Sequence, residues 1–199
     1  MSSTFPDDDD TVTTATRPAP SATPALLPDP PAPRSAHRTS TDVALVATFA
    51  VVVAGLVLGA RRGFLAVALY LVVGLAGVPV FAEMTGGLGV LGKPSVGYLL
   101  AFPLAAAVAG WLGGRALRTR PVWRFPLLVA AGLGSSFLVT HPAGVLGLMA
   151  RLGVGAREAV AIDAVYWPGD VVKNLLAAGV TLAVLRAFPD LRPGRRSRP

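Results

Sequence analysis

The chain has 199 residues, 53% of them hydrophobic and only 15% charged, with a mean hydropathy of +0.60 and no cysteine. Soluble domains carry about 25% charged residues, so this composition excludes an ordinary soluble domain and indicates a membrane protein, while the lack of cysteine excludes disulfides and thiolate chemistry. The net charge of +7 comes from arginines between apolar runs and at the C-terminus, which favours loops facing an anionic membrane leaflet over a nucleic-acid groove.

The first 41 residues differ in composition from the rest of the chain. They contain four consecutive aspartates at residues 7–10, followed by a mixture of threonine, alanine and proline. Proline breaks helices, and little in this stretch can be buried, so we predict a disordered tail over residues 1–41. The stretch lacks the basic flank and the continuous apolar region of a signal peptide.

Five apolar runs follow the tail. Each is close to the 17–25 residues that a helix needs to cross the hydrocarbon core of a bilayer, and lipid cannot satisfy an open strand edge. We therefore predict an all-α fold, a polytopic integral membrane bundle of five to six transmembrane helices within residues 42–189. Residues 157–167, between the last two runs, predict a short surface or re-entrant helix. The runs are residues 43–60, 64–82, 97–114, 125–150 and 171–188.

Alternating crossings place most of the positive charge at one end of the bundle. The positive-inside rule assigns such an end to the cytoplasm. This predicts a multi-pass protein of the cytoplasmic membrane, in contact with its lipid, with residues 190–199 as a basic cytoplasmic tail. The arginines at this end outside the tail are Arg61, Arg62, Arg115, Arg118, Arg120 and Arg124.

The opposite end receives a glycine-dense stretch that begins at residue 86 and enters the third apolar run. Glycine accepts backbone dihedrals that other residues avoid, so such a loop can bring its backbone close to a ligand. The loop also carries Glu83 and Lys93. We interpret it as a small-molecule binding loop at the outer membrane surface.

Asp170 and Lys173 open the last apolar run. Three residues apart, they lie on one face of a helix, and charged groups at a membrane span tend to face a cavity or each other. The same pattern also fits a simpler arrangement, in which Asp170 caps the helix N-terminus and Lys173 extends its ammonium group to the interface. The residues alone leave both interpretations open.

Other polar side chains have simple structural explanations. Glu83 fits a solvated loop acid as well as an acceptor for a ligand N–H, and Tyr98 fits an interfacial tyrosine as well as a ligand contact. His141, beside Pro142, fits a helix kink satisfied by its neighbours better than a metal ligand. No nucleophile elbow, P-loop or dinucleotide fingerprint is present, so the sequence predicts neither an enzyme nor a cofactor or metal site.

Several short motifs together resemble one family, BioY. They are AGLVLG at 54–59, RG at 62–63, LYL at 69–71, GLAGVPVF at 74–81, GGLG at 86–89, GYL at 97–99, FP at 102–103 and PGDVVK at 168–173. Members of this family are the substrate-binding S components of energy-coupling factor (ECF) biotin transporters. The resemblance implies a six-helix membrane protein that captures biotin, its transported ligand, from the outer side.

By position, the resemblance implies a set of functional residues. Asp170 and Lys173 match the polar pair that contacts biotin, the loop residues close over the ligand, and Tyr98 heads the following helix. Small residues on the first family helix contact a coupling protein, and Ala50 and Ala54 are the candidates here. The implied biotin-binding residues are Glu83, Thr85, Gly86, Gly87, Tyr98, Asp170 and Lys173.

The resemblance also implies partners. They are a transmembrane coupling protein and two cytoplasmic ATPase subunits, because the chain itself has no nucleotide-binding motif. Two alternatives stay open at this point. One is a divergent paralogue that imports another vitamin or a biotin precursor, and the other is a membrane protein that binds biotin without transporting it.

Overall fold

The computed structural model describes residues 35–191, and the side chains of residues 46–190. Residues 1–34 and 192–199, which hold most of the two predicted tails, lie outside the described part of the chain. Within that part every element is helical, apart from a single bridge between Phe81 and Thr85. The longer helices are α1 (Ser35–Leu58), α2 (Ala60–Leu75), α3 (Val96–Ala116), α4 (Pro121–Ser135), α5 (His141–Leu152), α6 (Ala156–Ala164) and α7 (Trp167–Ala187).

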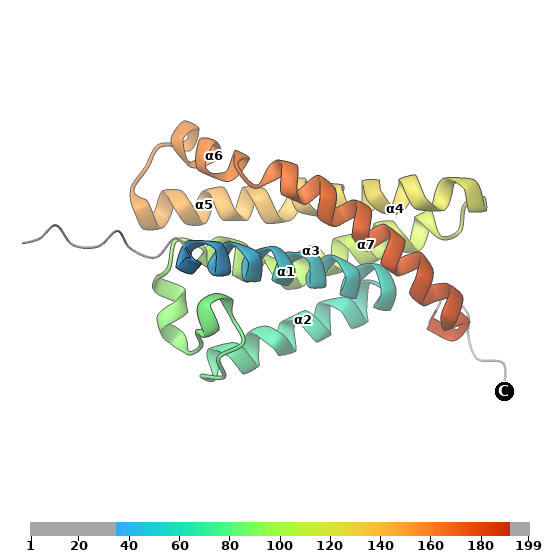
Figure 1. Ribbon diagram of the computed structural model, residues 1–199, viewed down its shortest axis with the longest axis horizontal. Coiled ribbons are helices and arrows are strands. Elements are labelled where there is room, and N and C mark those ends of the chain that lie inside the picture. The colour runs from blue at the N-terminus through green and yellow to red at the C-terminus, as the bar shows by residue number, and fades with distance from the viewer. Residues whose placement is uncertain (1–34, 192–199) are drawn as a thin grey trace, which may run out of the picture. The chain divides into compact units, whose positions relative to one another are not determined.

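The helices run back and forth along one direction (Figure 1). α4 and α5 form one continuous rod, because a π-helical turn, Ser136–Thr140, joins them without a break. The glycine-rich segment and the α5–α6 connection lie at one end of the bundle. The α1–α2 turn, the start of α4 and the end of α7 lie at the other end (Figure 1). This alternation confirms the predicted arrangement, in which the arginine-rich turns share one end and the glycine loop the other.

Three helical segments in the described part of the chain are long and apolar enough to cross a membrane. They are Val96–Ala116, Pro121–Leu152 and Trp167–Ala187, and Val46–Leu58 is a shorter apolar helix. At 1.5 Å per residue the 32-residue segment is about 48 Å long, whereas the hydrocarbon core is about 30 Å thick. The rod therefore tilts or extends beyond the hydrocarbon layer.

Helix α3 lies at the centre of the bundle and packs against α1, α2, α4 and α5. Its alanines at positions 105, 106 and 109 are almost fully buried. Large apolar side chains instead cover the outer faces of the other helices, for example Leu65 and Leu69 on α2, which are each 63% exposed. An apolar outer face and a small-residue interior are typical of a helical bundle in lipid.

Glycines allow α1 and α3 to approach each other closely. A Cβ added to Gly55 would lie 2.3 Å from the carbonyl oxygen of Ala106, and one added to Gly110 would lie 2.5 Å from the backbone of Gly59. Of the small-residue pairs in this sequence, Gly55 and Gly110 thus serve a contact within the chain. Lipid supplies no hydrophobic force between helices, so such close packing is a main source of cohesion.

Some boundaries differ from the sequence-based prediction. α1 begins at Ser35, inside the range predicted to be a disordered tail, so residues 35–41 are helical. α2 ends at Leu75, whereas the second apolar run extends to residue 82. Beyond the helix end, Phe81 folds back against Tyr70 and Gly74 of α2 and is only 4% exposed. The predicted short helix before the last run is α6.

We expect Gly110→Ala to destabilise the bundle and Gly114→Ala to leave it unchanged or slightly more stable. The added methyl group at residue 110 meets rigid backbone atoms, and overpacking of this kind costs about 1–3 kcal/mol. No atom lies within 4 Å of a Cβ at residue 114, and alanine favours a helix over glycine. Thermal unfolding of the detergent-solubilised protein measures both, and equal melting temperatures would contradict the proposed contact.

Candidate functional site

A cluster of buried polar side chains lies at the end of the bundle that carries the glycine loop. Asp170, in the first turn of α7, is 6% exposed and forms an ion pair with Lys173 one turn later. Lys173 also donates a 2.8 Å hydrogen bond to the hydroxyl oxygen of Thr48 on α1. The pair predicted from the sequence therefore faces the interior of the bundle. Neither the capping of α7 by Asp170 nor an exposed Lys173 is seen.

His141 connects this pair to a second carboxylate. Its Nδ1 lies 2.8 Å from Oδ1 of Asp163 on α6, and its Nε2 lies 2.8 Å from Oδ2 of Asp170. The second contact is short but lies off the line of a good hydrogen bond, so Nε2 has no well-formed partner. One imidazole ring thus lies between two buried carboxylates.

Asp163 is the most completely surrounded member of the cluster, with an exposed fraction of 1%. Besides His141, it accepts hydrogen bonds from the hydroxyl group of Tyr98 (2.6 Å) and from Nε1 of Trp167 (2.9 Å). These three contacts use most of the acceptor capacity of the carboxyl group. Asp163 ties α6 to α3, α5 and α7 at one point.

The backbone around residues 136–142 explains how His141 reaches this position. The amide of His141 donates to the carbonyl of Ser136, five residues earlier, which is the wide π pattern. Pro142 has no N–H, so a regular α-helical bond at this turn is impossible in any case. The wide turn changes the helical phase, and the ring of His141 packs against Phe137 with centroids 4.7 Å apart.

Further polar groups continue along the buried face of α7. Asn174 donates a 2.8 Å hydrogen bond to the carbonyl oxygen of Asp170, and its own Oδ1 lies against Gly132, where a Cβ would be 2.0 Å away. Thr181, two turns further, is fully buried. Asn174 Oδ1 and Thr181 Oγ1 have no hydrogen-bond partner among the described residues.

The glycine loop packs against the end of α2. The amide of Gly87 donates to the carbonyl of Gly74 at 2.7 Å, and a Cβ on Gly86 would lie 2.4 Å from the carbonyl oxygen of Val78. Gly87 has a φ of 82°, and Glu83 and Met84 also have positive φ values of 61° and 53°. Positive φ at two consecutive non-glycine residues stores strain in this turn.

Lys93 pairs with two polar side chains of the loop. Its Nζ lies 3.2 Å from Oε2 of Glu83 and 3.4 Å from the hydroxyl oxygen of Thr85, which itself donates to the carbonyl of Ala82 at 2.7 Å. Glu83 and Lys93 are both well exposed. In this structure Glu83 therefore behaves as a paired loop acid.

The residues predicted from the sequence fall into two groups. Tyr98, Asp170 and Lys173 belong to the buried cluster, through His141 and Asp163. Glu83, Thr85, Gly86 and Gly87 belong to the loop. Among residues 46–190, no hydrogen bond or ion pair joins the loop group to the cluster.

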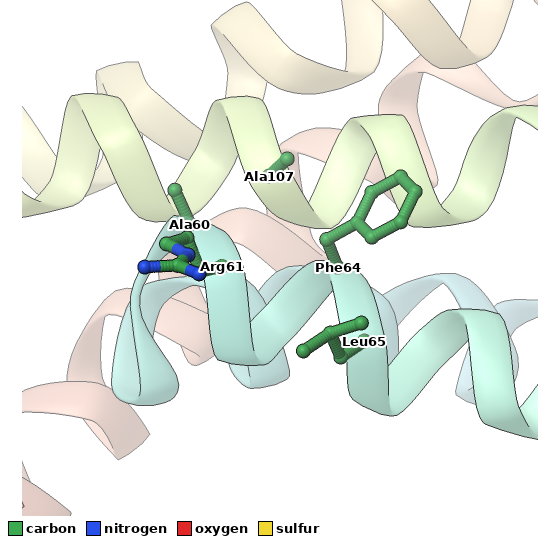
Figure 2. Close-up of a pocket in the computed structure, with 5 residues that line it drawn as sticks. All are labelled: Ala60, Arg61, Phe64, Leu65 and Ala107. Carbon is green, nitrogen blue, oxygen red and sulfur yellow. The ribbon is translucent and has the colours of Figure 1, made fainter.

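Two hollows in the surface of the described residues are mainly apolar, and none of the cluster side chains lines either of them. One, of about 330 Å³, lies between α2 and α3 at the arginine-rich end and is lined by Ala60, Arg61, Phe64, Leu65 and Ala107 (Figure 2). The other, of about 730 Å³, is a groove between α3 and α5. The polar cluster is buried, and most of its polar atoms contact one another.

The chain is similar along most of its length to known proteins. Residues 41–190 match the BioY family. The chain belongs to the BioY family. Two curated relatives are the biotin transporter BioY of Rhizobium etli (34% identical over 148 residues, 73% of this chain and 78% of the relative) and that of Thermotoga maritima (48% over 143 residues, 67% and 75%).

A solved structure shares the fold. It is the crystal structure of the S-component for biotin from an ECF-type ABC transporter, with a TM-score of 0.61 and 20% identity, over 70% of this chain and 73% of that one. The predicted all-α membrane bundle is therefore confirmed as an S-component fold, and the protein is a multi-pass membrane protein. Among the described residues, no group of histidines and carboxylates has the arrangement of a metal site.

Sequence reasoning missed three members of the BioY cluster. The sequence analysis interprets His141 as part of a kink and includes Asp163 and Trp167 only in the range of a short helix. The available signal was the presence of buried charge: a carboxylate and a histidine within apolar segments need partners, and Asp163 and Trp167 lie one turn apart.

The two alanines predicted to contact a partner have different environments in this BioY chain. Ala50 is exposed on α1, and Ala54 is partly buried and packs against the core formed with α2 and α3. Ala50 is therefore available to a neighbouring helix, while Ala54 is largely used within the bundle. Contact with a partner stays a prediction for both.

We expect Gly86→Ala to loosen the loop, because its methyl group would collide with the carbonyl oxygen of Val78. Gly89→Ala is the matched control, since no atom lies within 4 Å of a Cβ there. Hydrogen–deuterium exchange of residues 76–95 measures the effect. Faster exchange in Gly86→Ala alone is expected, and identical exchange in both variants would show that the close approach is absent.

Proposed function

We propose that this chain is the biotin-binding S component of an ECF-type transporter and takes up biotin across the cytoplasmic membrane. Membership of the BioY family carries the proposal, because the relatives that share most of its length are biotin transporters. The buried cluster supports the proposal, since it brings a carboxylate acceptor and a cation together inside an apolar bundle.

The chemistry of biotin fits the Asp170–Lys173 pair. Biotin has a ureido ring with two N–H donors and a carbonyl acceptor, an apolar bicycle and a valerate carboxylate. A carboxylate accepts the ureido N–H groups, and an ammonium group donates to the ureido carbonyl or complements the valerate. In a low-dielectric interior such charge-assisted bonds are strong and geometrically selective.

Capture requires a change in the closed cluster. Both carboxylate oxygens of Asp170 are engaged, one by Lys173 and one by the ring of His141. The ligand therefore gains its bonds by replacing contacts that already exist. The loop with Glu83, Thr85, Gly86 and Gly87 then orders over the ligand, with Tyr98 at the adjacent start of α3.

The membrane orientation follows from charge. The end with the α1–α2 and α3–α4 turns carries Arg61, Arg62 and the arginines between residues 115 and 124. The positive-inside rule places that end and the C-terminus in the cytoplasm. The glycine loop consequently faces the outside, where biotin is captured.

Release to the cytoplasm needs energy from other chains. We infer a transmembrane coupling protein and two ATPase subunits as partners, because the relative of known structure belongs to an ECF-type ABC transporter and this sequence has no P-loop. Ala50 supports the proposed docking of the coupling protein, because a small exposed residue lets a neighbouring helix approach closely.

We expect Asp170→Asn and Lys173→Ala each to weaken biotin binding by about 10- to 100-fold, the usual value of a hydrogen bond to a charged group. Asp190→Asn, which removes an exposed carboxylate beyond the other end of α7, is the control and keeps full affinity. Equilibrium binding of labelled biotin to the purified chain measures all three. Unchanged affinity in both cluster variants would remove this pair from the binding site.

We expect a biotin-requiring bacterial host without its own biotin transporter to accumulate labelled biotin when it expresses this chain with the coupling protein and the ATPase pair. Accumulation falls sharply when the ATPases are replaced by variants that cannot hydrolyse ATP, because the inward step then lacks its energy source. Equal uptake with active and inactive ATPases would contradict the proposed partnership, and binding without any uptake would indicate a biotin-binding protein that does not transport.

A further inference from the structure

The ring of His141 contacts carboxylate oxygens on both sides. Its two ring nitrogens lie 2.8 Å from Oδ1 of Asp163 and 2.8 Å from Oδ2 of Asp170. A neutral imidazole has one N–H and one lone pair, so in either tautomer it would turn a lone pair toward a carboxylate at this distance. Only the imidazolium form presents a donor to both, and it also makes the cluster electrically balanced, with two anions and two cations.

Among the side chains of residues 46–190, no other group around His141 relieves this demand. Tyr98 from α3 and Nε1 of Trp167 donate to Asp163, and Lys173 from α7 pairs with Asp170. The rings of Phe137 and Trp167 pack beside the imidazole. The polar groups among them contact the two carboxyl groups, and none of them accepts a hydrogen bond from the ring. The two carboxylates together therefore require that both ring nitrogens of His141 carry a proton.

The two contacts of His141 differ in quality. The Asp163 side has hydrogen-bond geometry, and Asp163 is fixed in place by Tyr98 and Trp167. The Asp170 side is short but poorly aligned. Asp170 also pairs with Lys173 through its other oxygen. A competing donor therefore replaces His141 at Asp170 more readily than it replaces Lys173.

We propose that His141 is a positioning residue held by Asp163, and that the ligand exchanges with it at Asp170, so that binding releases a proton. This inference rests on the proposed biotin-binding function. A ureido N–H of the ligand donates to Oδ2 of Asp170 in place of Nε2 of His141. The Nε2–H bond of the imidazolium then breaks, its electron pair stays on the ring, and the proton passes to water. The neutral ring keeps its N–H at Nδ1, directed at Asp163.

The direction of the pH dependence follows from this exchange. Because the free protein carries the proton and the complex does not, raising the pH favours the complex. Biotin affinity increases between about pH 6 and 8, with a limiting slope of about tenfold per pH unit for one proton released. The valerate carboxylate of biotin stays ionised throughout this range and adds no slope of its own.

The test is isothermal titration of the detergent-solubilised full chain with biotin, in buffers with different ionisation enthalpies and at several pH values. Wild-type protein is expected to release a proton on binding, and His141→Asn to bind biotin with no proton release and a flat pH profile. Asp190→Asn is the matched control. It removes an exposed carboxylate outside the cluster and leaves both buried carboxylates against the ring, so the proton release persists.

The outcomes separate this inference from the function on which it rests. No biotin binding by wild-type protein overturns the proposed function and the proton release with it. Biotin binding with no proton release and no pH dependence overturns the inference alone, and this result does not depend on any variant. An undiminished proton release in folded His141→Asn overturns the assignment to this residue.

Discussion

Buried charge in an apolar bundle is the constraint on which the candidate site depends. A carboxylate inside a membrane protein is costly unless it has partners, and Asp163 and Asp170 are both almost fully buried. Their partners come from α3, α5 and α7, and Lys173 in turn donates to Thr48 on α1, so the cluster holds together helices that are distant in sequence. Breaking one such contact leaves an unpaired charge behind, which is why the cluster acts as one unit rather than as separate pairs.

Much of the architecture followed from composition and spacing. The apolar runs predicted the helical passes, and the arginines predicted which turns share an end, because both follow from local properties of the chain. The family resemblance located Asp170 and Lys173, and the structure places them together in the interior. The end of α2 was misplaced, since an apolar segment that folds back onto a helix has the same hydropathy as the helix itself.

The rest of the site depends on tertiary structure. Asp163 lies 22 positions from His141 and 65 positions from Tyr98 in the sequence, and no spacing rule connects residues so far apart. Glu83 and Thr85 were grouped with Asp170 by resemblance, whereas in this structure they pair with Lys93. The glycine loop and the cluster are therefore two separate bonded groups, and the proposed capture of a ligand is the event that would bring them together.

The wide turn at Ser136–Thr140 has a consequence for how this region tolerates change. A π-helical turn holds one residue more than an α-helical turn, so it rotates the following segment by about 100° relative to an uninterrupted helix. Deleting a single amino acid there would restore the regular winding and swing the imidazole away from α6 and α7. The number of residues is thus more tightly constrained here than their type. Replacing Leu138, which is 72% exposed, changes the cluster little, whereas removing one residue from the segment separates the imidazole from both carboxylates.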